Sequence, residues 1–248
     1  MGSRSVSRAG AAVSLIAISM GLAMPAHAEE AAEQKPAAEE GQGRSNEIVV
    51  TARKRAESIQ DVPAAVTAVT MEELTTRQVT GGPDLMTQVP NMTFTKTNFS
   101  GYSIQIRGIG TQAISVTTDP AVGVALNNTP FIRNRFFEQE FFDLERVEIL
   151  RGPQGTLYGR NATAGVVNLV TAKPKFEPGA KLSVDVGSYN QIRTEGMINI
   201  PIVDDKVALR LAGAWTKRDG YVHNSITDKQ IGGRDLWSTR ASLLFRPT

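Results

Sequence analysis

The stretch that decides the fold is DLERVEILRGPQGTLYGRNA at residues 143–162, which leads into GVVNLVT at residues 165–171. Two short and mostly apolar runs, at 147–150 and 166–170, predict strands. Between and beside them, glycines at positions 152, 155, 159 and 165 predict tight turns and close backbone approach, since a Cβ atom would block both. A phosphate-binding loop is not predicted, because no Lys-Ser or Lys-Thr pair follows the glycines.

The residues upstream of this stretch complete a small α+β domain. A helix is predicted over residues 72–79, ending at Gly81-Gly82-Pro83. Further strands are predicted at about 66–70, 103–107 and 122–126. Together these elements predict a mixed domain with a core large enough to fold.

Beyond Pro174 the pattern changes to alternation of apolar and polar residues, which is typical of strands with two different faces. Four such segments follow, within residues 181–186, 195–202, 207–218 and 237–246; Arg210 and Arg240 fall on polar faces. Segments of about 9–11 residues suit tilted strands of an outer-membrane barrel, and aromatic residues near segment ends suit its girdles. Alternation alone also fits a soluble β-sandwich sheet, so both interpretations stay open at this point.

The first 28 residues have the three-part pattern of a secretory signal peptide. Arg4 and Arg8 precede an apolar run, and Ala26-His27-Ala28 supplies small residues for cleavage between Ala28 and Glu29. Residues 29–46 are rich in Ala, Glu, Gln and Gly and nearly lack large apolar side chains, which predicts a disordered tether. We therefore expect export of a mature chain that begins with this tether.

After the tether, the sequence turns abruptly β-branched. The segment comprises Glu47, Ile48, Val49, Val50, Thr51 and Ala52. Such residues favour an extended backbone, whose hydrogen-bonding groups must find partners. Two interpretations remain equally open: an ordinary first strand of the next domain, or a docking strand that adds to the edge of a partner's sheet.

Composition excludes several classes of function. The 248 residues hold 27 Lys and Arg against 25 Asp and Glu, and removal of Arg4 and Arg8 with the leader balances the charges, which does not indicate a nucleic-acid partner. There is no cysteine, and of two histidines one leaves with the leader. Without metal-ligand clusters or a serine elbow, we expect neither an enzyme, nor a cofactor, nor a metal site.

Residues 143–171 closely resemble the plug domain of TonB-dependent outer-membrane receptors. The IRGIG run at 106–110 and the DVP run at 61–63 resemble the same family, and residues 47–52 resemble its TonB box. The resemblance extends from about residue 47 to the last residue. It implies a TonB box (47–52), a plug (53–175) and the opening antiparallel strands of a transmembrane barrel (176–248). Together with the signal peptide (1–28) and the tether (29–46) predicted above, this gives five segments.

The resemblance also implies a function. It implies an outer-membrane importer in which TonB, part of an inner-membrane complex, grips the box and displaces the plug, so that a scarce nutrient such as a ferric siderophore can enter. Arg107 and Arg151 match plug arginines that pair with carboxylates on later barrel strands. Polar segments at 95–102 and 111–117 are expected at the cargo-facing apex, and the aromatic, basic patch at 131–137 is expected against the barrel wall.

Four strands cannot close a barrel, and an open sheet in lipid would leave unpaired edges. We therefore expect the sequence to be an N-terminal part of a longer receptor that cannot transport by itself. The alternative is a stand-alone plug-like binding or signalling module. Signalling receptors of the family carry an extra folded domain before the box, for which the tether is too short.

Overall fold

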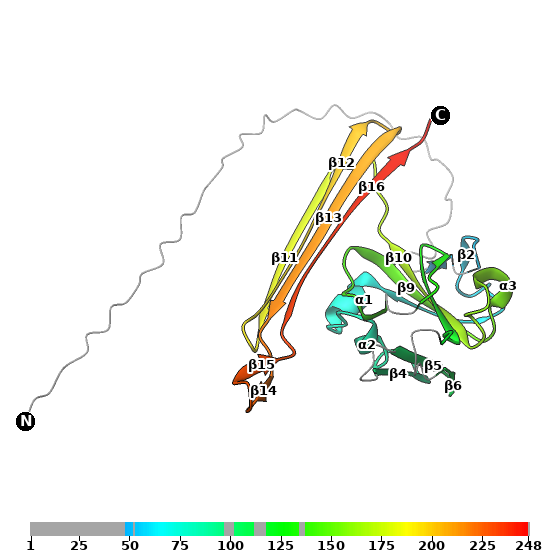
Figure 1. Ribbon diagram of the computed structural model, residues 1–248. Coiled ribbons are helices and arrows are strands. Elements are labelled where there is room, and N and C mark those ends of the chain that lie inside the picture. Colours follow the sequence, from blue (N-terminus) through cyan, green and yellow to red (C-terminus); the bar gives the residue numbers. More distant parts are fainter. Residues whose placement is uncertain (1–47, 52, 97–101, 112–117, 134–136, 248) are drawn as a thin grey trace, which may run out of the picture. The chain divides into compact units, whose positions relative to one another are not determined.

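The computed structural model describes residues 48–51, 53–96, 102–111, 118–133 and 137–247, all within one compact unit of the chain (Figure 1). The expected leader, tether and cleavage residues Ala28 and Glu29 lie outside the described residues, as do Glu47 and Ala52 at the two ends of the expected box. No helix within the described part of the chain is both long and apolar enough to cross a membrane.

A five-stranded mixed sheet forms the centre of the α+β domain. Its order is β3-β9-β10-β7-β8, with bounds Ala65–Thr70, Leu144–Arg151, Gly165–Thr171, Val122–Leu126 and Thr129–Pro130. Strand β10 runs antiparallel to β9 and parallel to β7. The strands expected at 66–70, 122–126, 147–150 and 166–170 are thereby confirmed.

The turn chemistry around β9 and β10 follows from the glycines. Gly152 adopts a φ of 109°, which side-chain-bearing residues rarely adopt. A Cβ added at Gly165 would lie 2.4 Å from the carbonyl oxygen of Leu150 on the neighbouring strand. The close pairing of the two strands therefore requires glycine at position 165.

Three short helices accompany this sheet: α1 (Met71–Thr76), α2 (Gly82–Leu85) and α3 (Gly155–Tyr158). Thr70 caps the N-terminus of helix α1: its hydroxyl accepts a hydrogen bond from the Glu73 amide, and the Glu73 carboxylate accepts one from the Thr70 amide. It ends earlier than the expected helix at 72–79, because Gln78 turns to a positive φ of 55°.

Two smaller sheets flank the central one. Strand β1 (Val49–Val50) pairs with β2 (Glu57–Ser58), and β4 (Met92–Lys96), β5 (Tyr102–Ile106) and β6 (Ile109–Gly110) form a three-stranded sheet. The strand expected at 103–107 is confirmed, one residue earlier. Of the polar segment 95–102 that is expected at the cargo-facing apex, residues 95 and 96 belong to β4 and residue 102 begins β5.

The main core lies on one face of the central sheet and is closed by α1, α2 and the three-stranded sheet. Its members include Leu74, Leu85, Ile104, Val124 and Ile149. Phe137 is also fully buried in it, and Phe131 packs against it. The expectation that the 131–137 patch packs on a barrel wall is therefore wrong for these two rings, which stabilise their own domain.

A four-stranded antiparallel sheet follows, drawn from yellow to red in Figure 1. It consists of β11 (Gly179–Gly187), β12 (Gln191–Val203), β13 (Val207–Arg218) and β16 (Arg234–Phe245), each paired with the next. Between β13 and β16 the chain forms a short hairpin, β14 (Val222–Asn224) with β15 (Lys229–Ile231).

The two faces of this sheet differ as the alternation predicts. Leu182, Val186 and Trp237 on one face are 74%, 79% and 75% exposed, whereas Arg193 and Arg210 on the other are buried. A soluble sandwich buries its apolar face, so the exposed apolar face indicates strands made to contact lipid. The chain thus combines a plug-like α+β domain with part of a barrel wall.

Candidate functional site

The expected box is docked on the α+β domain. Its strand β1 pairs with β2 through Val49–Ser58 and Val50–Glu57, and the amide of Ile59 donates to the carbonyl of Ile48 at 3.0 Å. The Val50 side chain is 1% exposed, while that of Val49 points to solvent. Residues 53–60, which could reach about 26 Å if extended, therefore fold back on the box as a hairpin.

Thr51 connects this hairpin to a buried carboxylate on β9. Its amide donates to Glu148 Oε1 at 2.7 Å, and its hydroxyl lies 3.3 Å from the same oxygen. Arg146 donates from Nε to Oε1 at 2.8 Å and from Nη2 to the Thr51 hydroxyl at 3.3 Å. Asn168 on β10 donates to Glu148 Oε2 at 3.1 Å. We call these four residues the Glu148 cluster.

The charged side chains of the Glu148 cluster are buried, and removing them from water costs free energy. Glu148 is 0% exposed and the Arg146 side chain is 8% exposed. A charge removed from water must be compensated by partners and hydrogen bonds. Here the partners come from three parts of the chain, so the carboxylate joins the box, β9 and β10.

The polar contacts continue beyond the Glu148 cluster. Asn168 donates to the side-chain oxygen of Asn128 at 2.9 Å, and the Tyr158 hydroxyl donates to the same oxygen at 2.8 Å. Burial of Tyr158, together with the negative charge of Glu148, raises the pKa of the Tyr158 phenol well above its usual value. The ammonium of Lys54, just after the box, lies 5.7 Å from the centre of the Tyr158 ring.

The two expected lock arginines lie in different environments. Arg107 follows β5 in a turn with a φ of 56°, and its side chain is exposed. Arg151 ends β9, donates from Nη2 to the Thr67 hydroxyl at 3.0 Å, and has a buried Nε without a hydrogen-bond partner among the described residues. Neither arginine forms an ion pair within the part of the chain that the structure describes.

The ion pairs that join the α+β domain to the four-stranded sheet reverse the expected arrangement. Here the α+β domain supplies the carboxylate and the sheet supplies the arginines. Asp143, just before β9, accepts hydrogen bonds from Nε of Arg210 on β13 at 3.1 and 3.0 Å, and also from Nη2 of that residue. Arg240 on β16 donates to Asp143 Oδ2 at 2.7 Å. We call Asp143, Arg210 and Arg240 the Asp143 clasp.

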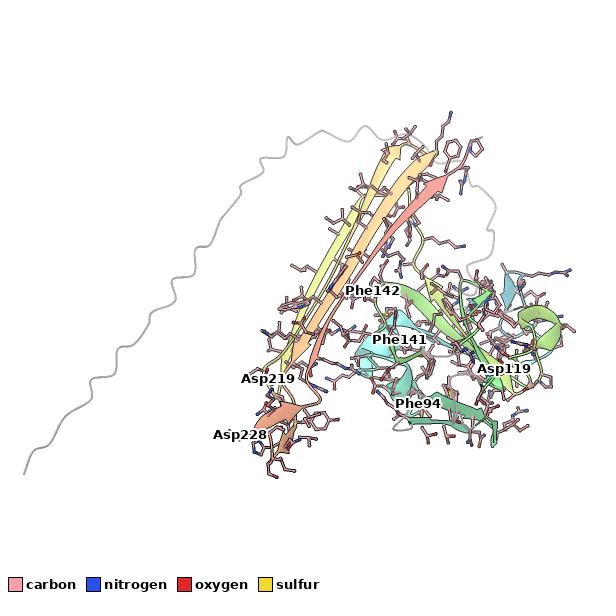
Figure 2. The ribbon with its side chains drawn as sticks, in the orientation of Figure 1. Phe94, Asp119, Phe141, Phe142, Asp219 and Asp228 are labelled. Carbon is pink, nitrogen blue, oxygen red and sulfur yellow. The ribbon has the colours of Figure 1, made fainter. Side chains whose placement is uncertain are left out.

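Neighbouring residues extend the clasp along the segment 140–143, where Figure 2 labels Phe141 and Phe142. Arg193 on β12 donates to the carbonyl of Phe141 at 2.8 Å. The Arg240 guanidinium lies 4.9 Å from the centre of the Phe142 ring. Glu140 accepts from Thr216 at 2.5 Å and from Arg234 at 3.2 Å.

Sequence reasoning missed Asp143 and Glu140 as contact residues. It placed Arg210 and Arg240 on the polar faces of their strands without assigning them partners. A signal was available, since arginines on an inward face must meet acceptors, and Asp143 and Glu140 flank the two phenylalanines before β9. The pairing itself depends on residues 67 positions or more apart and on how the sheet folds back.

Other expected sites are less informative. The 111–117 segment lies almost wholly outside the described residues, as does part of 95–102. Among the residues that the structure describes, no group of three or more His, Cys, Asp and Glu side chains could hold a metal ion.

Comparison with known proteins identifies related chains. Residues 58–166 match the family model described as the TonB-dependent Receptor Plug Domain. The chain is 30% identical over 210 residues to the pesticin receptor of Yersinia pestis, covering 83% of this chain and 30% of the relative. It is 27% identical over 193 residues to a vitamin B12 transporter of Vibrio vulnificus, covering 75% and 30%.

The chain also resembles a solved structure in fold. The ferric yersiniabactin uptake receptor of Yersinia pestis superposes with a TM-score of 0.66 at 27% identity, over 73% of this chain and 28% of that one. The chain thus spans about 30% of the length of the relatives that it matches.

Proposed function

Because the chain belongs to the TonB-dependent receptors, with a plug domain followed by part of a barrel, we propose that it forms the plug and first strands of an energised outer-membrane importer. In this proposal the leader 1–28 is cleaved between Ala28 and Glu29, and the tether 29–46 presents the box 47–52 in the periplasm. The plug comprises 53–175, and residues 176–248 begin the barrel wall. The protein carries out no chemical reaction; it moves a bound molecule.

The observation that carries this proposal is the way the box is held. Strand β1 consists of two residues, and its ladder partner β2 lies only about eight residues further along the chain. A strand with so short a ladder can exchange its partner for the sheet edge of another protein. TonB, the expected partner, would gain main-chain pairing with Ile48, Val49 and Val50 and could then pull on the plug.

The expected cargo is a scarce metal chelate. Relatives include a receptor for ferric yersiniabactin and a vitamin B12 transporter, and both cargoes are organic chelates of a transition metal. We propose a ferric siderophore for this receptor, with the metal carried inside its chelator rather than bound by protein side chains. Growth on single iron sources, with cobalamin-dependent growth as the alternative outcome, identifies the cargo class.

The energy-coupling role is tested with Val50→Pro in the full-length receptor. Proline removes the amide that a partner strand would use and resists pairing in the ladder. We expect energised uptake of the cargo to be lost while cargo binding to whole cells persists. A matched control, Ala38→Pro, places the same residue in the tether and should leave uptake at the parental rate.

Equal uptake by the Val50→Pro variant and the parent, at equal receptor abundance, contradicts the coupling role. Loss of binding together with uptake instead reports a receptor that is not assembled, and abundance in outer-membrane fractions detects this. The comparison of uptake with binding therefore separates energy coupling from assembly.

A further inference from the structure

We propose that Glu148 is the positioning residue that holds the TonB box on the plug when TonB is absent, through its contact with Thr51. This inference deepens the proposed function, because it assigns regulation to the same segment. It does not involve cargo contacts or the barrel, and it rests on the geometry of the Glu148 cluster.

The first step is that Thr51 makes the long-range polar contacts of the box. The β1–β2 ladder is local, so it forms a hairpin without attaching that hairpin to the sheet of the plug. Among the described residues, the long-range polar contacts of residues 48–51 are those of Thr51 with Glu148 and Arg146, 97 and 95 positions away. Burial of the Val50 side chain adds an apolar contact.

The second step is that Glu148 needs Thr51. Oε1 receives the Thr51 amide, the Thr51 hydroxyl and Arg146 Nε, whereas Oε2 receives Asn168. Departure of the box removes both Thr51 donors from one oxygen of a fully buried carboxylate. Since hydrogen bonds to a carboxylate are among the strong ones, these two donors favour the docked state of the box.

The third step is that the geometry around position 51 requires a small side chain with a hydroxyl group. Its hydroxyl lies within 3.3 Å of both Glu148 Oε1 and Arg146 Nη2, so one small side chain closes a three-membered ring of contacts. A hydroxyl can donate to the carboxylate and accept from the guanidinium at the same time. Valine has the same shape but can do neither, whereas serine can do both.

The position of Glu148 also links the box to the rest of the plug. Glu148 pairs with Asn168 across β9 and β10 and with Ala68 across β9 and β3, which places it in the middle of the sheet. Asp143 of the clasp immediately precedes the same strand. A pull on the docked box therefore acts first on β9, the strand that the Asp143 clasp joins to the barrel wall.

The test uses thiol protection in outer-membrane fractions that lack TonB. Residues 1–248 contain no cysteine, so Val50→Cys introduces a single thiol into them, and any thiol elsewhere in the full-length receptor is changed to serine. Val50 is 1% exposed when docked and should react slowly with a maleimide reagent. A second reporter, Val167→Cys, is buried in the main core and detects loosening of the plug as a whole.

With Glu148→Gln, we expect the labelling rate of Val50→Cys to rise about tenfold, which corresponds to about 1.4 kcal/mol of docking free energy. The rate of Val167→Cys should not change. Thr51→Val should raise the Val50→Cys rate several-fold, and Thr51→Ser should keep it at the parental value. Glu72→Gln, an exposed glutamate on α1, is the matched control and should have no effect.

The proposal is overturned if Glu148→Gln leaves Val50→Cys protected, or if the rates at Val50→Cys and Val167→Cys rise together. The outcome is independent of the uptake test. If Val50→Pro loses uptake but Val50→Cys stays protected in Glu148→Gln, the holding role of Glu148 is refuted. The proposed transport function is then still supported. Unchanged uptake with Val50→Pro refutes the function, and thiol protection still reports whether Glu148 holds the segment.

Discussion

Asp143 and Arg210 form a buried ion pair between the plug and the barrel strands, with Arg210 Nε at 3.1 and 3.0 Å from the two carboxylate oxygens. Their side chains are 5% and 9% exposed. Arg240 adds a second guanidinium to the same carboxylate. The carboxylate of Asp143, the residue before β9, thus binds arginines from two neighbouring strands, β13 and β16.

Asp143→Asn should loosen the plug. The neutral amide leaves two arginines, largely buried, without their counter-charge, and removal of one member of a buried pair costs about 3–5 kcal/mol. The measurement is the urea concentration at which the plug of the full-length receptor becomes sensitive to protease. Asp119→Asn is the control, because Asp119 and Arg160 form an exposed pair at 3.5 Å. Equal midpoints for the two variants would contradict a role for the clasp.

Arg151→Ala should weaken plug retention more than Arg107→Ala. Arg151 is half-buried and its Nε has no partner among the described residues, so a carboxylate from a later strand would satisfy it. Arg107 is exposed, and an exposed ion pair contributes at most about 1 kcal/mol. The same protease assay compares the two variants. Indistinguishable midpoints would show that Arg151 is not the stronger lock.

The raised pKa of Tyr158 predicts that the stability of the plug falls at alkaline pH. Its folded-state pKa is raised by burial and by the charge of Glu148, so the folded state binds the phenolic proton more tightly than the unfolded state. Stability is then unaffected below about pH 10, the ordinary pKa of tyrosine, and falls above it by up to about 1.4 kcal/mol per pH unit.

Urea unfolding at pH 9 and pH 11 measures this effect. The parent should lose stability between the two values, and Tyr158→Phe should lose less, although it starts lower because the bond to Asn128 is gone. Tyr189→Phe, at an exposed tyrosine, should behave as the parent does. An identical pH dependence for Tyr158→Phe and the parent would show that this phenol does not titrate with unfolding.

Gly165→Ala should destabilise the plug. The added methyl would lie 2.4 Å from the Leu150 carbonyl oxygen and 2.8 Å from Cδ1 of Ile106, so β9 and β10 must separate. Overpacking of this kind costs about 1–3 kcal/mol. Gly155→Ala is the matched control, since a Cβ there meets nothing within 4 Å. Comparison of the two urea midpoints tests whether the glycine is needed for strand pairing.

Much of the fold could be predicted because its signals are local. The runs at 122–126 and 166–170, and the alternation after residue 174, indicate strands from neighbouring residues alone. Strand β4 was not predicted, because the alternation of Met92 and Phe94 with threonines in MTFTK is too short to tell from a loop until its pairing with β5 is known. Phe137 was misplaced for a similar reason: an aromatic side chain is apolar in any core, and local sequence does not say which core receives it.

Some residues of the candidate site could likewise be predicted from the sequence, and others could not. The β-branched segment at 47–52 and the arginines at 107 and 151 are visible in the sequence, and their roles in TonB binding and in the lock remain predictions. The partners of Thr51 and Asp143 were not visible, since they lie 97 and 67 positions away.

The amino-acid sequence by itself determined most of the strands, the glycine positions at the turns and which face of each barrel strand is apolar, because these depend on backbone sterics and on alternation between neighbours. Only the tertiary structure decided that Glu148 meets the box and that Asp143 meets Arg210 and Arg240. Buried charges are tolerated only where folding brings their partners within hydrogen-bonding distance, and that distance is a property of the packed chain.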